Sequence, residues 1–277
     1  MVDIVDNAVL VMILAGLAAG LINSTLGFGN LLSFVVLTSV LGVPALAAHL
    51  ANQVSAPASF ATAAWVSRKR HAATWRMVLV GGLGTGAGGV ALAWIPADWV
   101  HNAAPVGVLA GALLLVLVPA MRHWHVRWQL PGLALAGLWG GTVGAGVGSF
   151  VMPCVDGPTA GPTRNVLCFP MGLAVAIPLV ILSPGRITWV MVAALSAGML
   201  VGGYLGSRFL AWLPARQSTS DQLRMVMAVM ALGAAVFLYG GSVLTALSVA
   251  ASALLIVAGL TALRHHSLRH HATVGGS

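Results

Sequence analysis

The chain is organised around residues 20–57, which read GLINSTLGFGNLLSFVVLTSVLGVPALAAHLANQVSAP. This apolar stretch is interrupted at Gly27-Phe28-Gly29-Asn30, and it closes with Asn52-Gln53 and Pro57. Residues 141–170 repeat the pattern, with a glycine break at 144–148 and with Asn165 five positions before Pro170. Both stretches are apolar enough to lie in a bilayer, and glycine allows the backbone to leave the helical conformation at each break.

The composition indicates an all-α polytopic membrane protein. Of the 277 residues, 59% are hydrophobic and 6% are charged, whereas about a quarter of a typical soluble domain is charged. A membrane span needs about 20 apolar residues, so this length predicts about eight to ten transmembrane helices. We expect them near residues 8–28, 45–66, 76–96, 99–119, 131–149, 164–183, 188–210, 222–240 and 242–263. Segments 30–43 and 149–160 are too short to cross upright, so we expect each to be broken or re-entrant.

The basic residues indicate the orientation of the chain. The formal charge of +8 comes mainly from clusters within residues 67–76, 120–130, 211–224 and 264–271, which lie between or after apolar spans. The positive-inside rule places such loops in the cytoplasm, so we expect a lipid bilayer and no nucleic acid as partner. If each short segment crosses the membrane or dips into it as a broken helix, the N-terminus lies outside and all four clusters fall inside. If neither crosses, the first two clusters lie on the opposite side from the other two.

The same clusters divide the sequence into four parts. We expect a first transmembrane repeat at 1–120, a basic cytoplasmic loop at 121–130, a second transmembrane repeat with trailing helices at 131–263, and a basic, His-rich tail at 264–277.

The two halves are related by an internal repeat. Its matches are Asn52 and Pro57 with Asn165 and Pro170 at a shift of 113, Thr74-Trp75 with Thr188-Trp189 at 114, and Gly27 and Gly29 with Gly146 and Gly148 at 119. In the favoured topology the loop before Trp75 is inside and the loop before Trp189 is outside, which predicts an inverted repeat. Glycines four apart, as at Gly16 and Gly20 or Gly198 and Gly202, predict close packing between helices.

The two breaks together predict a site for a small anion. A helix that ends within the membrane presents unpaired amides and a partial positive charge, which can hold an anion where two repeats meet. The planar guanidinium of arginine also suits the geometry of an oxyanion. The expected substrate-binding residues are Gly27, Gly29, Asn30, Asn52, Gln53, Gly146, Gly148, Arg164 and Asn165.

The polar residues also have structural interpretations, which the sequence leaves open. Asn52 and Asn165 could bond the backbone freed by the neighbouring prolines, and Arg164 could form an ion pair with Asp156. His49 and Asp156 are candidates for proton coupling, because histidine titrates near neutral pH. The competing interpretation of His49 is a core residue with its hydrogen bonds satisfied.

An enzyme is not indicated. The sequence has five acidic residues and no recognisable catalytic motif, so we expect no cofactor, no metal site and no catalytic residues. Ser24 and His49 could in principle form an intramembrane protease pair, but nothing else in the sequence accompanies them.

With its glycine-broken first helix, the Gly42-Val43-Pro44 turn, Asn52 and the Gly84-x-x-x-Gly88-Gly89 pattern, the chain resembles the TauE/SafE sulfite-exporter-like family over about residues 8–240. The second half resembles the family's second copy through residues 137–148, 164–170 and 198–206. The resemblance implies a multi-pass permease of the bacterial inner (plasma) membrane that moves sulfite or organosulfonates, commonly outward. It departs from the family at Gln53, where a lysine is frequent, and Arg164 could supply the missing charge.

Alternating access between the halves is the expected mode of transport. The alternative is a passive anion channel or a non-transporting membrane scaffold, in which the polar residues only repair the helix breaks. A homo-oligomer is compatible with the sequence.

Overall fold

The computed structural model describes residues 2–96, 98–99, 125–144, 146–155 and 159–212. The regular elements of this part are all helices, as the sequence predicts. The expected spans at 99–119, 222–240 and 242–263, the His-rich tail and Asp156 lie outside the described residues.

The described helices follow the chain in two comparable series. The first is α1 (Val2–Thr25), α2 (Gly29–Val35) with a π-helical turn at Val36–Val40, α3 (Ala45–Ser67) and α4 (Trp75–Trp94). The second is α6 (His125–Thr142), α7 (Val147–Val151) with a 3-10 turn at Met152–Cys154, α8 (Ala160–Leu182), a 3-10 turn at Pro184–Arg186, and α9 (Trp189–Trp212). Residues 7–25 of α1 and the whole of α4, α8 and α9 are long and apolar enough to cross a membrane. The chain is therefore a polytopic helical membrane protein.

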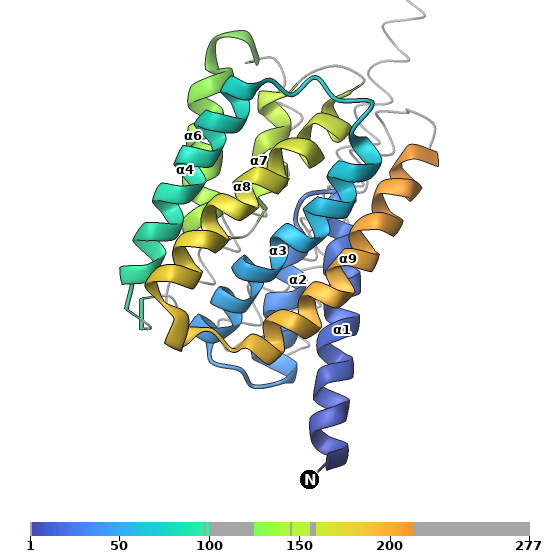
Figure 1. The fold of residues 1–277 in the computed structure, drawn as a ribbon, viewed down its shortest axis with the longest axis vertical. Coiled ribbons are helices and arrows are strands. Elements are labelled where there is room, and N and C mark those ends of the chain that lie inside the picture. The colour runs from blue at the N-terminus through green and yellow to red at the C-terminus, as the bar shows by residue number, and fades with distance from the viewer. Residues whose placement is uncertain (1, 97, 100–124, 145, 156–158, 213–277) are drawn as a thin grey trace, which may run out of the picture.

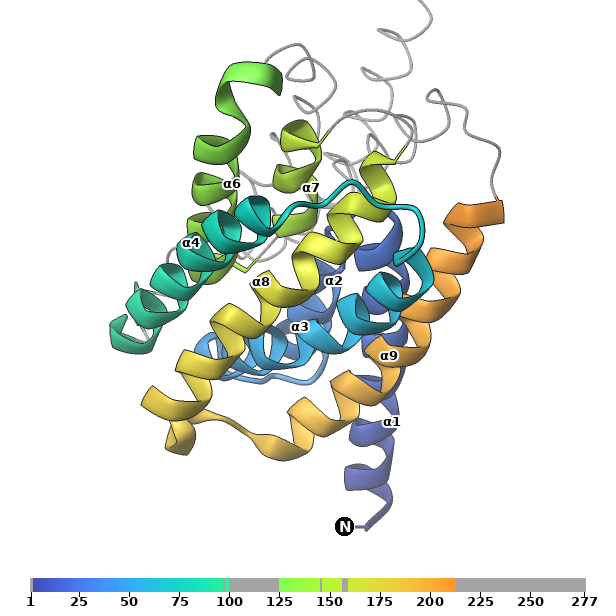
Figure 2. The same ribbon diagram turned by 45° about the horizontal axis from the view of Figure 1, so that its top comes forward.

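Helices of one series pack against helices of the other. Helix α1 packs along α9, and α4 packs along α6 (Figure 1). Helices α3 and α8 lie in the middle: α3 also packs on α9, α8 also packs on α4, and the two contact each other (Figure 2). Helix α3, which carries Asn52 and Gln53, is thus covered by the apolar helices α8 and α9 on its two sides.

Glycines allow the closest of these contacts. A methyl group added at Gly20 of α1 would lie 2.5 Å from the Met199 carbonyl oxygen of α9. One added at Gly88 of α4 would lie 2.6 Å from the Leu138 carbonyl oxygen of α6. The expectation that glycines at a spacing of four residues serve close helix packing is confirmed at these seams.

The helices end at the glycine breaks, where the sequence alone placed the boundaries less well. Helix α1 ends at Thr25 and α6 ends at Thr142, not at 28 and 149 as expected, because Gly27, Gly144 and Gly146 adopt positive φ angles of 82°, 72° and 77°. After the first break the chain turns back along α1, so that Phe34 and Leu37 pack with Met12. The polar turns at the start of α6 and α8 are helical as well, so these helices begin at His125 and Ala160, before the expected 131 and 164.

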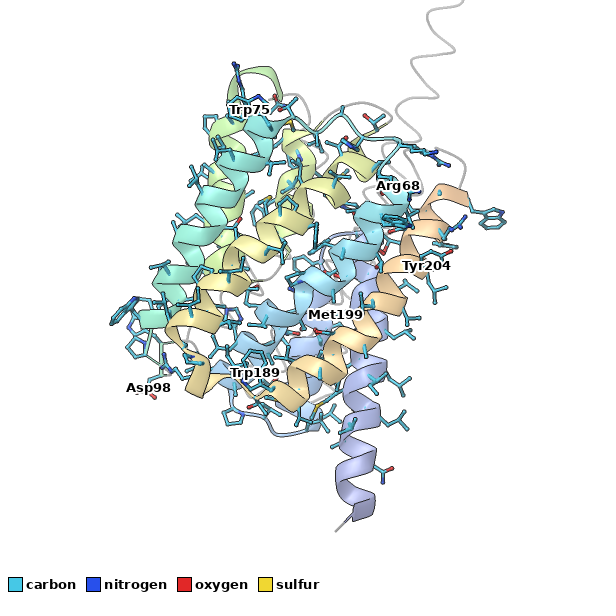
Figure 3. The ribbon with its side chains drawn as sticks, in the orientation of Figure 1. Arg68, Trp75, Asp98, Trp189, Met199 and Tyr204 are labelled. Atoms are coloured by element: carbon cyan, nitrogen blue, oxygen red, sulfur yellow. The ribbon has the colours of Figure 1, made fainter. Side chains whose placement is uncertain are left out.

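Exposed tryptophans mark the two ends of the helical bundle. Helix α4 begins at Trp75 and ends at Trp94, and α9 begins at Trp189 and ends at Trp212, all four exposed. The nineteen steps of α4 correspond to about 28 Å of helix, close to the roughly 30 Å of a bilayer's hydrocarbon core. Figure 3 shows Arg68 and Trp75 at one end and Asp98 and Trp189 at the other. This arrangement is typical of aromatic belts at two membrane interfaces.

Candidate functional site

The two glycine breaks are in direct contact, although more than a hundred residues separate them in the sequence. A methyl group added at Gly27 would lie 2.5 Å from the carbonyl carbon of Gly148, and one added at Gly148 would lie 2.6 Å from the Gly27 Cα. Ser149 Oγ donates to the Leu26 carbonyl oxygen at 2.8 Å, which ties the breaks together. Gly146 packs against the Phe28 ring in the same contact.

A network of buried amides surrounds the first break. Asn23 Oδ1 accepts from the Gly29 amide at 2.6 Å, and Asn23 Nδ2 donates to Asn30 Oδ1 at 2.7 Å. Asn52 Nδ2 donates to the Asn30 carbonyl oxygen at 3.0 Å, and Asn52 Oδ1 accepts from Ser33 Oγ at 2.7 Å. These bonds satisfy polar groups that would be costly to bury alone. The Gly29 amide, expected to be open to an anion, thus has a protein acceptor.

Arg164 and Asn165 of α8 cap the C-terminal end of α1. Arg164 Nη1 donates to the Thr25 carbonyl oxygen at 3.0 Å, and Nη2 donates to the Ser24 carbonyl oxygen. Asn165 Nδ2 donates to the same Ser24 oxygen at 3.2 Å, while its Oδ1 accepts from Arg164 Nη2 at 2.8 Å. The last carbonyls of a helix lack partners within the helix and carry partial negative charge, so a buried guanidinium is well matched to them.

His49 and Gln53 of α3 make the corresponding contacts at the C-terminal end of α6. Gln53 Nε2 donates to the carbonyl oxygens of Gly140 and Gly141 at 2.7 and 3.1 Å. His49 Nε2 lies 2.9 Å from the Thr142 carbonyl oxygen. Each interrupted helix is therefore capped by side chains from the other half of the chain. We call the Arg164–Asn165 contacts the α1 cap and the His49–Gln53 contacts the α6 cap.

The structure brings the sequence-predicted residues together, with the exception of Asp156, which lies outside the described residues. Asn30 joins the two breaks, because its Nδ2 lies 3.4 Å from the Gly144 carbonyl oxygen. Asn52 bonds α2 and Asn165 bonds α1, so these contacts reach other helices and do not repair the proline kinks. His49 is a buried residue with a described backbone partner, as its structural interpretation expects.

Sequence reasoning missed two buried serines. Ser33 bonds Asn52, and Ser207 lies beside Gly206, which packs against Leu21 and Ser24 near the α1 cap. Within the described part of the chain, Ser207 Oγ is the one buried side-chain oxygen or nitrogen without a hydrogen-bond partner. A lone serine in an apolar helix gives no sequence signal, because its role depends on what packs against it.

Comparison with known proteins identifies a family for this chain. The family model for the sulfite exporter TauE/SafE matches residues 12–238, which include both breaks and both caps. The chain belongs to the TauE/SafE sulfite exporter family. No curated protein and no solved structure matches the chain significantly. TauE/SafE is a family of transporters.

Proposed function

We propose that this TauE/SafE member is a permease of the bacterial inner membrane that exports sulfite or a small organosulfonate by alternating access. The observation that supports this most is the contact of two glycine breaks inside a polar cluster, within an otherwise apolar bundle. Buried amides and a buried guanidinium are expensive in a membrane helix and commonly mark a substrate path. Family membership supplies the class of substrate.

The packing of the helices supports an inverted repeat. In this repeat α1, α3 and α4 of the first series correspond to α6, α8 and α9 of the second. The first and third helices of the first series, α1 and α3, both pack on α9. Their counterparts α6 and α8 both pack on α4. A twofold relation between the halves would produce this exchange of partners. The opposite placement of Trp75 and Trp189 in Figure 3 agrees with two halves inserted in opposite directions. The turn of α2 back along α1 supports a re-entrant hairpin.

The two caps provide a route to alternating access. In the present structure both are formed, so the donors that could bind an anion are bonded to helix carbonyls. Opening toward one side separates α8 from α1 and frees Arg164 and Asn165 for the oxygens of the substrate. Opening toward the other side separates α3 from α6 and frees His49 and Gln53. Because Gly27 and Gly148 stay in contact, the two openings do not occur together.

The alternative function is a passive anion channel or a membrane scaffold. It is favoured by the extensive hydrogen bonding of the cluster, where Ser207 is the single unsatisfied side chain among the described residues. A saturated network would equally serve to hold two broken helices together.

Transport assays with proteoliposomes distinguish these functions. With an imposed proton gradient, a coupled permease accumulates labelled sulfite against the sulfite concentration gradient. A channel only equilibrates sulfite across the membrane, and a scaffold gives no flux. Arg164→Ala and Asn165→Ala are expected to reduce the flux strongly. Unchanged flux in both variants would contradict the assigned site, even if transport itself were established.

A further inference from the structure

Two arginines are held against aromatic rings of their own helices. The guanidinium carbon of Arg68 lies 4.0 Å from the centroid of the Trp65 ring, and Nη1 donates to the Trp65 carbonyl oxygen at 2.8 Å. The guanidinium carbon of Arg208 lies 5.4 Å from the centroid of the Tyr204 ring, and Nε donates to the Tyr204 hydroxyl at 3.2 Å. These contacts restrain both cations and use one nitrogen of each guanidinium, and the other two nitrogens bond no residue in the described part of the chain.

The two pairs flank one seam between α3 and α9. Thr62 Oγ1 donates to the Leu200 carbonyl oxygen at 3.0 Å, and a methyl group added at Gly203 would lie 2.6 Å from that hydroxyl. Both helices run toward the same end of the molecule (Figures 1 and 2). Trp65 and Tyr204 therefore lie one turn beyond this contact, each on its own helix. Figure 3 shows Arg68 and Tyr204 on these neighbouring ends.

The surroundings of this seam are exposed, aromatic and basic, and no carboxylate among the described residues balances their positive charge. Trp65 is 65% exposed and Tyr204 is 41% exposed, so both rings face outward from the bundle. Lys69 and Arg70 follow Arg68 and are exposed as well. No described carboxylate pairs with Arg68 or Arg208, and Asp98 lies at the opposite end of the molecule (Figure 3).

We propose that Arg68 and Arg208, with Trp65 and Tyr204, form a binding site for the headgroup phosphate of an anionic phospholipid. The forked guanidinium groups match phosphate oxygens, and they present donors from two sides of the seam. Exposed Trp and Tyr rings favour the depth where headgroups meet acyl chains, so a lipid held there would run its acyl chains down the apolar faces of α3 and α9. A free phosphate ion would bind the guanidinium groups but would make no contact with the apolar helix faces. The site therefore favours a lipid over a free ion.

Native mass spectrometry of the full-length protein tests this site. The protein is released from nanodiscs containing equal amounts of phosphatidylglycerol and phosphatidylcholine, and the lipids it retains are counted. The wild type is expected to retain phosphatidylglycerol in preference to phosphatidylcholine. Arg68→Gln with Arg208→Gln should lower that retention at least about fivefold, because both fixed phosphate donors are lost. Lys69→Gln with Arg70→Gln removes the same charge from the adjoining loop and should lower it less than about twofold.

Three outcomes would overturn the proposal. One is a wild type without preference for phosphatidylglycerol, which needs no variant and so does not depend on folding of the mutants. Another is an equal loss in the two double variants, which would indicate only general attraction of anionic lipid to a basic surface. Displacement of the lipid by excess inorganic phosphate would show that the acyl chains contribute nothing.

Discussion

Gly27 is subject to two constraints, a left-handed backbone and a backbone contact across the break. Its φ angle is 82°, and an added methyl group would meet Gly148. Gly42 shares the first constraint, with φ of 65°, but an added methyl group there meets nothing within 4 Å. Substitution of Gly42 therefore measures the cost of a side chain in the left-handed conformation alone. Substitution of Gly27 measures that cost together with the cost of overpacking.

We expect Gly27→Ala to destabilise the protein more than Gly42→Ala. The left-handed conformation alone costs about 1–2 kcal/mol for a residue with a side chain, and overpacking adds about 1–3 kcal/mol. The thermal unfolding midpoint of the detergent-solubilised protein measures the difference. Equal decreases of the unfolding midpoint in both variants would show that Gly27 and Gly148 are not in close contact.

Arg164 acts on the α1 cap through three acceptors, two carbonyl oxygens of α1 and the Asn165 side chain. Arg164→Gln should leave the ends of α1 and α8 with unpaired polar groups and lower the free energy of unfolding by about 1–3 kcal/mol. Arg70→Gln removes the same charge from an exposed loop position and should leave stability within about 0.5 kcal/mol. The same unfolding assay compares them. A neutral Arg164→Gln would argue against the cap.

At the scale of elements, the seams between helices depend on glycine. A methyl group at Gly202 of α9 would overlap the Leu17 carbonyl oxygen and lie 2.8 Å from the Leu21 amide nitrogen. We expect Gly202→Ala to push α9 from α1 and to destabilise the protein by about 1–3 kcal/mol.

Gly82 of α4 provides the matched control for the seam. A methyl group there would lie at an ordinary 4.0 Å from the Ala174 Cβ. Gly82→Ala should be neutral or stabilising by up to about 1 kcal/mol, since alanine favours the helix. The thermal unfolding midpoints of Gly202→Ala and Gly82→Ala test this difference. An unchanged midpoint for Gly202→Ala would mean that α1 and α9 are not in such close contact.

At the scale of the whole molecule, the orientation of the two halves can be measured. Lys69 lies in the loop before Trp75, and Gly185 lies in the loop before Trp189; both are exposed. Single cysteines at these positions, in a background with Cys154→Ala and Cys168→Ala, can be labelled with a membrane-impermeant maleimide. In intact cells Gly185→Cys should react, whereas Lys69→Cys should react only after permeabilisation. Reaction of both from the same side would exclude an inverted repeat.

Much of the fold followed from patterns that are local in the sequence. Apolar length predicted the described spans, and the glycine breaks predicted where α1 and α6 are interrupted. Residues within one helix or break carry these signals, because hydrophobic burial and backbone freedom act over a few neighbouring positions. The same local signals placed helix ends imprecisely, as for α6, which ends at Thr142. Hydropathy carries no information on where a glycine with a positive φ angle ends a helix.

The sequence by itself determined the class of protein, the described membrane helices and several of the polar residues at the breaks, although not Ser33. Only the tertiary structure decided how those residues are used. It placed Arg164 on the carbonyls of α1 and Gln53 on the carbonyls of α6, each across the interface between the halves. Hydrogen-bond partners so far apart in the chain are chosen by helix packing, which depends on many small contacts at once and leaves no pattern at either residue.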